Sequence, residues 1–336
     1  MYIAAMRKPL KINSCTVAKE AGVSQSTVSK VANNNVHLTE DTRRRVIDAA
    51  HRLGYSLQPR HGHRLIAVIV PENDFQGYIA SLLYSVSMEL RRRNYNMEIL
   101  PDTMLHLINE RCVDAAISLS WRYDLNREWA AKMILPLVRI NSASDHIKHI
   151  FSVLIDGMTS VKNTVDRLWR LGHRKVGFFF FNTFEHELRN DSKRREGFLN
   201  AMQAHGVESP EKYCLYDCLN IKTDVLARTL LKWHREGVSA LFFANPIATG
   251  KMLHVISKTG LDVPRELSLI GWEQELFSEH FTPPLSTLHA DSKLLAANAV
   301  DLVETLLTNP ALAKDIIVQY KWTNRKSIAK CNLSVI

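Results

Sequence analysis

The sequence has no run of about eighteen consecutive apolar residues, the length that a helix needs to cross a lipid bilayer. We therefore expect no membrane contact. The first eleven residues, MYIAAMRKPLK, lack the apolar core and the cleavage site of a secretory signal peptide. Both absences predict a cytoplasmic protein, whether translation starts at Met1 or at Met6.

Cysteine is scarce and irregularly spaced. An odd number of scattered cysteines predicts free thiols in a reducing compartment rather than a disulfide framework. Cys214 and Cys218 have the spacing of half a metal site, but no second pair or matching histidines accompany them. We expect no metal and no cofactor. The five cysteines are Cys15, Cys112, Cys214, Cys218 and Cys331.

Common catalytic motifs are also missing. The chain has no GxGxxG turn, no HExxH helix and no GxSxG elbow. Gly250-Lys251 is similar to part of a phosphate-binding loop, but Asn245 replaces the first glycine and Met252 replaces Ser or Thr. We therefore expect no catalytic residues and no enzyme activity.

Positive charge is concentrated at one end of the chain. The formal net charge is +9, and residues 1–64 alone hold eleven Lys/Arg against four Asp/Glu. A small, strongly basic domain is typical of proteins that bind phosphate backbones.

The basic segment begins with the pattern of two short helices around a tight turn. Val17, Ala18 and Ala21 form one apolar face, and Gly22 follows where a positive φ is needed. Ser24 is a suitable N-cap for the second helix. The inner face of that helix carries Val28 and Val31, and the outer face carries Gln25, Ser26, Ser29 and Lys30. This pattern predicts a helix-turn-helix.

A third helix is expected from Thr39 or Glu40, with Gly54 as its C-terminal cap. Its apolar stripe comprises Val46, Ile47, Ala50 and Leu53. A three-helix bundle that binds another protein is the alternative, since a basic run such as residues 43–45 is often only a solvated face. The glycine turn, the polar second helix and the charge asymmetry together favour DNA binding.

Residues 21–46, AGVSQSTVSKVANNNVHLTEDTRRRV, resemble the headpiece of the LacI/GalR family of bacterial transcription regulators almost residue for residue. Further matches follow in family order: Tyr95, LGHRKV at 171–176, RREGF at 194–198, ALFFAN at 240–245, VPRELSLIG at 263–271 and PPLSTL at 283–288. The resemblance implies a headpiece joined to a core with the periplasmic-binding-protein fold.

From Leu65 onward short apolar segments alternate with helical ones, which predicts parallel sheets with helices on both faces. Some ten candidate strands favour two sheets over one, so we expect an α/β core of two doubly wound parallel-sheet subdomains with a cleft between them. The clearest strands are 65–71, 96–100, 115–119, 136–140, 176–181, 240–244, 266–271 and 286–288. The clearest helices are 78–93, 157–171, 192–205 and 291–308, and further helical segments are expected between the strands 96–100, 115–119 and 136–140.

The resemblance also implies three crossings between the subdomains, near Asp156, Leu288 and Val318. The predicted segments are an all-α headpiece at 1–55, a linker at 56–64, an N-subdomain at about 65–157 and 289–318, and a C-subdomain at about 158–288 and 319–336. The linker is shorter than the family's, and it lacks the usual hinge element that inserts a leucine into the minor groove. No C-terminal heptad repeat indicates a coiled-coil tetramer.

We expect a homodimer to place two recognition helices in successive major grooves of a near-palindromic, double-stranded operator. Gln25, Ser26 and Lys30 are predicted to read base edges, since Gln suits adenine and Lys suits guanine. The surrounding small polar residues are predicted to hold phosphates, a role that local capping does not preclude. They are Ser24, Thr27, Ser29, Asn33, His37, Thr39 and Thr42, with Asn13 capping the first helix.

The resemblance further implies a small-molecule effector in the core. The matching contact positions are Asn141, Arg194, Asn245 and Glu273, and Phe75 and Trp272 are candidate aromatic walls. Arg194 can fork hydrogen bonds to a ligand, or it can be one solvated cation in the run 193–195. The family usually has Asn-Asp at 245–246 and Gly-Phe-Asp-Asp at 271–274, and this chain departs from both.

Three functions remain open. The favoured one is a transcriptional repressor controlled by a sugar or sugar derivative. The second is a DNA-binding regulator with a degenerate pocket, controlled by abundance or by a protein partner, which Pro246 and the short linker favour. The third is a solute-binding protein, which the intact headpiece and the missing signal peptide disfavour.

Overall fold

The computed structural model describes residues 13–32, 38–55, 57, 64–72, 77–110, 113–133, 135–180, 189–243, 246–273 and 276–331. The chain divides into two compact units. The first unit comprises Met1–Leu154 and Ser292–Ile316, and the second comprises Ile155–Asp291 and Ile317–Ile336. No helix in the described ranges is long and apolar enough to cross a bilayer.

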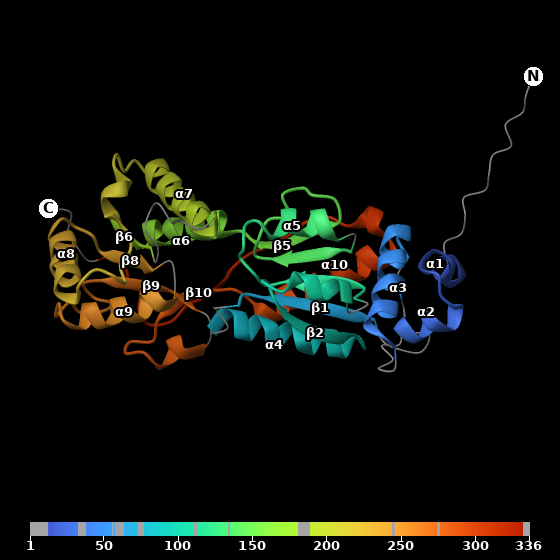
Figure 1. Ribbon diagram of the computed structural model, residues 1–336. Helices are drawn as coiled ribbons and strands as arrows, with labels where there is room; N and C mark the ends of the chain where they lie inside the picture. Colours follow the sequence, from blue (N-terminus) through green and yellow to red (C-terminus); the bar gives the residue numbers. More distant parts are fainter. Residues whose placement is uncertain are drawn as a thin grey trace, which may run out of the picture. The chain divides into compact units, whose positions relative to one another are not determined.

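Three helices form the headpiece, drawn in blue in Figure 1: α1 (Ser14–Ala21), α2 (Gln25–Ala32) and α3 (Glu40–Leu53). Their apolar faces meet in one small core, as the spacing predicted. That core comprises Val17, Ala18, Ala21, Val28, Val31, Ala32, Val46, Ile47, Ala49, Ala50 and Leu57. Leu57 lies beyond the predicted headpiece boundary, yet it is buried with the headpiece residues.

The first unit contains a sheet with the strand order β11-β5-β4-β3-β1-β2. Its strands are β1 (Leu65–Val70), β2 (Asn96–Pro101), β3 (Ala115–Ser118), β4 (Leu137–Ile140), β5 (Ile150–Ile155) and β11 (Ile316–Val318). The five strands from β1 to β5 pair in parallel.

Helices cover both faces of this sheet, which explains why β1 is almost continuously apolar. On one face Ala67 and Ile69 of β1 pack in a cluster with Leu125 and Trp129 of α5 (Leu125–Lys132). The 3-10 turn η1 (Leu105–Glu110) belongs to the same layer. The other face is covered by α4 (Gly77–Arg92) and α10 (Ser292–Thr308), which pack on each other.

The second unit contains a sheet with the order β12-β10-β9-β8-β6-β7. Its strands are β6 (Val176–Phe179), β7 (Cys214–Leu215), β8 (Ala240–Phe243), β9 (Ser268–Glu273), β10 (Ser286–His289) and β12 (Lys321–Thr323). The edge strand β12 runs antiparallel to β10, and the other described pairings are parallel.

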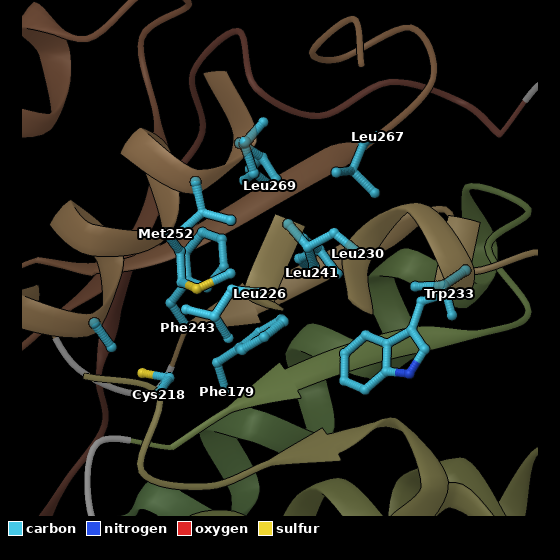
Figure 2. Packing of buried hydrophobic residues seen from close by; sticks show 14 of the residues in the cluster. Phe179, Cys218, Leu226, Leu230, Trp233, Leu241, Phe243, Met252, Leu267 and Leu269 are labelled. Carbon is cyan, nitrogen blue, oxygen red and sulfur yellow. The ribbon is translucent and has the colours of Figure 1, made fainter. Parts of the chain in front are cut away.

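Phe178 and Phe179 are consecutive residues of β6, so their rings lie on opposite faces of this sheet. Phe178 packs on α6 (Gly157–Arg170) and α7 (Arg189–Ala204), where its ring stacks on Phe198 with centroids 4.8 Å apart. Phe179 packs with Phe243 beneath α8 (Thr223–Arg235) and α9 (Pro246–Ser257), as Figure 2 shows. One apolar strand therefore supplies both hydrophobic layers of the second unit.

The last described segment lies across the beginnings of several strands in the second unit. Ser327 is fully buried: its Oγ donates to the Leu269 carbonyl (2.6 Å) and accepts from the Ser286 amide (2.8 Å). Ala329 N donates to Ser268 Oγ (3.1 Å), and Cys331 N donates to the Leu171 carbonyl (2.8 Å). These bonds tie the C-terminal segment to the start of β9, the start of β10 and the end of α6.

The predicted architecture, a helix-turn-helix headpiece followed by two mostly parallel-sheet subdomains, is confirmed. The clear sequence patterns did not include β5, β7, β11, β12, α8 and α9. Three of these strands have only two or three residues and lie at sheet edges, so they carry no measurable alternation. Short 3-10 turns complete the chain: η3 (Pro210–Tyr213), η4 (Leu276–His280) and η5 (Pro310–Leu312).

Candidate nucleic-acid interface and ligand site

Local caps fix the two helices of the helix-turn-helix. Asn13 Oδ1 accepts hydrogen bonds from the amides of Cys15 (3.0 Å) and Thr16 (3.1 Å), which satisfies free donors at the start of α1. Gly22 ends α1 with φ of 65°, in the left-handed region that glycine adopts without strain. Ser24 Oγ accepts from the Thr27 amide (3.1 Å) and so caps α2. Each of these capping hydrogen bonds spans at most three positions along the chain, so the local sequence specifies both caps.

The two faces of α2 differ as predicted. Val28 and Val31 are buried in the headpiece core. Gln25, Ser26 and Lys30 are exposed on the outer side, and Ser29 is half-buried. An exposed helix face of short polar and basic side chains is suited to entering a major groove.

Several predicted DNA contacts already have partners within the headpiece. Gln25 Nε2 donates to Ser14 Oγ of α1 (2.9 Å). Ser24 Oγ lies 2.8 Å from both Ser26 Oγ and Thr27 Oγ1. These bonds hold the start of α2 and orient its polar side chains.

Helix α3 begins and ends where the sequence predicted. Thr39 Oγ1 accepts from the Thr42 amide (3.4 Å), and Gly54 ends the helix with φ of 64°. Thr39 and Thr42 therefore lie together at one helix start. Asn33 and His37, also predicted as phosphate contacts, lie outside the described residues.

Asn141 directly follows β4, at the carboxyl end of a parallel sheet where ligands bind in this type of fold. Its φ is 57°, an uncommon conformation for a residue other than glycine, and its backbone amide donates to the Val153 carbonyl (2.8 Å). The residue is buried. Strained backbone at such an edge is consistent with a functional position.

Arg194 of α7 packs against two aromatic residues. Its guanidinium lies 4.2 Å from the ring centre of Trp272, and its Nη2 donates to the Tyr320 hydroxyl (2.8 Å). The Tyr320 ring meets Trp272 edge-on at 4.5 Å. Arg194 is half-buried, so it is not merely one solvated cation of a basic run.

Trp272 belongs to the hydrophobic core of the second unit. It is 5% exposed and stacks on Phe242 with centroids 5.6 Å apart. Phe242 stacks on the Trp272 ring, and the guanidinium of Arg194 also lies over this ring. The other predicted ligand contacts are not defined: Asn245 and Phe75 lie outside the described residues, and the side chain of Glu273 is likewise not described.

The residues similar to a phosphate-binding loop have a structural role. Lys251 Nζ donates to the carbonyl oxygens of Leu219 and Ile221, the latter at 2.6 Å. Among the described residues no group of three His, Cys, Asp or Glu side chains is arranged to hold a metal. Burial raises the pKa of Cys218 to about 11, so this thiol stays protonated near neutral pH.

Comparison with known protein families gives one match near the N-terminus of the chain and a second match in its C-terminal half. The sequence model of the bacterial regulatory proteins of the lacI family matches residues 16–58. That of the periplasmic binding protein-like domain matches residues 165–328. These two domains and the geometry above define a DNA-binding transcriptional regulator. The chain combines a lacI-family DNA-binding domain with a periplasmic-binding-protein-like domain.

Curated relatives that match over nearly the whole chain are also transcription regulators. The NTD biosynthesis operon regulator NtdR of Bacillus subtilis is 25% identical over 90% of this chain and 94% of its own. The transcriptional repressor PurR of Mannheimia succiniciproducens is 27% identical over 94% and 98%. Catabolite control protein A of Priestia megaterium is 26% identical over 90% and 94%.

Solved structures show the same fold. The lac repressor dimer bound to operator and the anti-inducer ONPF has a TM-score of 0.66 at 20% identity, covering 95% of this chain and 99% of that chain. The complex of the transcriptional regulator CelR with cellobiose has a TM-score of 0.65 at 22% identity, covering 94% and 100%.

The sequence patterns did not single out several residues that lie near Arg194 or are exposed on the first unit. Tyr320, the partner of Arg194, lies in a segment without helical or strand periodicity. Tyr84 and Met88 are exposed on α4, and their spacing of four residues off the buried stripe was an available signal. The exposed aromatics Trp121 and Tyr123 lie in the connection after β3, at the end of a parallel sheet where ligands are expected.

Proposed function

We propose that this protein is a transcriptional repressor that binds a near-palindromic operator as a homodimer and responds to a sugar-like effector in its core. The observation that carries the DNA-binding part is the exposed outer face of α2, opposite the buried Val28 and Val31. The excess of positive charge in residues 1–64 supports it, because phosphate contacts supply much of the affinity for DNA.

Gln25 and Lys30 are the proposed base-reading residues. Gln25 uses one amide hydrogen for Ser14, and it retains a second donor and its carbonyl acceptor. One donor and one acceptor are what the major-groove edge of adenine requires. Lys30 projects from the exposed side of the last turn of α2 and suits guanine.

The homodimer would form through α4 and β2 of the first unit. Tyr84 and Met88 are exposed one turn apart on α4, and Ile99 is exposed on β2, the edge strand of the sheet. Large exposed apolar side chains on neighbouring elements favour association. A two-fold dimer uses one such surface twice, and it matches the symmetry of a palindromic site.

Effector control rests on Asn141 and Arg194. Asn141 lies at the carboxyl edge of the first sheet, and Arg194 carries donors that suit hydroxyl groups. The second candidate is a regulator without a small-molecule effector. The bond of Arg194 to Tyr320 favours it, since this arginine already has contacts within the second unit.

Selection of binding sites from random duplex DNA with the full-length protein tests the proposal. We expect a symmetric site whose half-sites lie about one helical turn apart. Lys30→Ala should weaken binding to that site by about tenfold or more and relax specificity at one base pair per half-site. Lys258→Ala, which changes an exposed lysine of the second unit, is the matched control. Weak, steeply salt-dependent binding without a consensus would contradict the proposal.

A further inference from the structure

We propose that Ser14 sets part of the base specificity of this protein by holding Gln25 in an orientation that fits adenine and disfavours guanine. Ser14 belongs to α1 and acts through Gln25 of α2, so it is a positioning residue. The inference rests on the proposed base-reading role of Gln25. It adds a residue outside the second helix to those that determine the operator sequence.

Ser14 and Gln25 are the first residues of two successive helices. They are 11 positions apart along the chain, and Gln25 Nε2 donates to Ser14 Oγ across the turn (2.9 Å). Gln25 is exposed and Ser14 is half-buried. The hydrogen bond therefore lies at the surface, beside the outer face of α2, and it involves the amide group that is proposed to read a base.

The backbone at both ends of this hydrogen bond is fixed by local caps. At α1 the amide of Asn13 donates to Thr16 Oγ1 (3.4 Å), while the Asn13 side chain accepts from the Thr16 amide (3.1 Å). At α2 Ser24 Oγ accepts from the Thr27 amide (3.1 Å). Each helix start is set by its own cap, so the bond to Ser14 restrains mainly the side chain of Gln25.

The nearby hydroxyl of Ser24 is not able to replace that of Ser14. Ser24 Oγ lies 2.8 Å from Ser26 Oγ and 2.8 Å from Thr27 Oγ1, and it also accepts from the Thr27 amide. A serine hydroxyl offers one donor and two acceptor positions, and these three contacts use all of them. The orientation of Gln25 therefore depends on Ser14.

The hydrogen bond uses one of the two N–H donors of Gln25, which leaves one donor and the carbonyl acceptor. In the major groove adenine presents one acceptor, N7, and one donor, the N6 amino group. Guanine presents two acceptors, N7 and O6. The groups that remain on Gln25 are complementary to adenine, whereas guanine would place an acceptor oxygen against the Gln25 carbonyl.

The bond also fixes the direction in which the amide of Gln25 points. The terminal torsion of a glutamine is broad and roughly two-fold, so an unrestrained amide exchanges its carbonyl and amino groups readily. Without the Ser14 hydroxyl, both N–H donors are free to turn toward guanine. Loss of this hydroxyl should therefore change which base is preferred more than it changes the affinity for the phosphate backbone.

The test measures base preference with the full-length protein and the operator selected from random duplex DNA. Each base pair of both half-sites is changed in turn, and dissociation constants are measured by fluorescence anisotropy. Gln25→Ala identifies the position that Gln25 reads, because the preference for adenine is lost there. At that position we expect the wild type to prefer adenine over guanine by about tenfold, and Ser14→Ala to reduce the preference to about threefold or less.

Further variants separate positioning from a structural role. Ser14→Thr keeps the hydroxyl and should retain most of the preference. The double variant Ser14→Ala/Gln25→Ala should match Gln25→Ala, because Ser14 acts through Gln25. Ser257→Ala is the control, since Ser257 is an exposed serine of α9 whose hydroxyl also makes a hydrogen bond. Affinity for unrelated DNA at low salt should be alike in all variants, which shows that each headpiece is folded.

Several results would overturn the inference. An unchanged adenine preference in Ser14→Ala would show that Gln25 reads its base without Ser14. An equal loss of affinity for every base, seen also in the Gln25→Ala background, would show that Ser14 contacts DNA itself. A preference of Gln25 for another base would remove the adenine assignment. In each case the symmetric consensus remains, and the proposed function with it. A wild type that selects no consensus would remove both proposals together.

Discussion

Gly197 of α7 lies directly against the backbone of Met158 in α6. A Cβ atom placed on Gly197 would be 2.4 Å from the Met158 carbonyl oxygen and 2.9 Å from its Cα. No flexible side chain is involved, so nothing nearby can rotate away. The two helices therefore approach to a distance that only glycine permits.

We expect Gly197→Ala to lower the free energy of unfolding by about 1–3 kcal/mol, because the helices must separate to admit the methyl group. Gly250→Ala is the control, since a Cβ atom there meets nothing within 4 Å. In the interior of α9 this change should stabilise the protein by up to about 1 kcal/mol. Urea denaturation compares the two, and equal stabilities would contradict the close packing.

Glu89 stabilises the end of α4 through two arginines. It accepts from Arg92 (2.6 and 2.9 Å) and Arg93 (2.7 Å), and Arg93 also pairs with Asp301 (2.6 Å) and Glu304 (2.7 Å). The hydrogen bond from Arg92, with further bonds and charge from Arg93, lowers the pKa of Glu89 to about 2. The unfolded value is about 4.3, so this stabilisation is complete above that pH and is lost as the pH falls toward 2.

We expect Glu89→Gln to cost on the order of 1–2 kcal/mol at pH 7 and to make stability less dependent on pH between about 4.5 and 2.5. Urea midpoints at three pH values measure this. Asp224→Asn, which breaks the exposed pair with Arg228, should change little. Parallel pH profiles for wild type and Glu89→Gln would exclude this role of the carboxylate.

His173 joins the C-terminal segment to the second sheet. Its Nε2 must donate to the Ala329 carbonyl (3.1 Å), so Nδ1 accepts from Ser239 Oγ (2.8 Å) in the neutral ring. Burial lowers the pKa of His173. Its folded pKa is thus below the unfolded value of about 6.5, and the stabilisation is lost as the pH falls below about 6.5.

His173→Gln should therefore weaken the protein by about 1 kcal/mol at pH 7.5 and by less at pH 5.5. Thermal melting at the two pH values measures the difference. His254→Gln changes an exposed histidine of α9 and should leave the profile as in the wild type. A stability gap that stays constant between the two pH values would show that His173 does not titrate in this window.

Tyr84→Asp and Met88→Asp should each convert the proposed dimer to monomers, because a carboxylate buried in an apolar interface costs several kcal/mol. Sedimentation equilibrium measures the mass of each variant in solution. Operator affinity should also fall, because a monomer binds only one half-site. Val225→Asp, at an exposed apolar residue of α8, is the control. If both variants remain dimers, the interface lies elsewhere.

The sequence predicted the headpiece well because its signals are local. Asn13, Ser24 and Thr39 cap helices within three residues of themselves, and Gly22 and Gly54 turn the chain by their own φ. The alternation of apolar and polar residues and the family resemblance together were enough to predict a core with two sheets. Helices α8 and α9 were not predicted, although α8 buries Leu226, Leu230 and Trp233 at helical spacing.

The core contacts could not be predicted, because they join distant parts of the chain. Arg194 and Tyr320 are 126 positions apart, and only the fold brings them within hydrogen-bond distance. Arg139 stands in an otherwise apolar strand segment, PLVRI, and its partners Ser120 and Asn126 belong to the preceding connection and helix. No sequence spacing predicts that a buried arginine in a strand will donate hydrogen bonds to the backbone of the connection that precedes the neighbouring helix.

The order of elements along the chain has a consequence for synthesis. The headpiece takes its core from residues 17–57, so it can fold soon after leaving the ribosome. Each sheet is completed by a segment that is synthesised late. Helix α10 covers one face of the first sheet, and residues 325–331 form hydrogen bonds with strands of the second sheet. A ribosome that stalls before residue 292 would release a finished headpiece on an unfinished core. Such nascent fragments would carry the basic headpiece on two incomplete sheets.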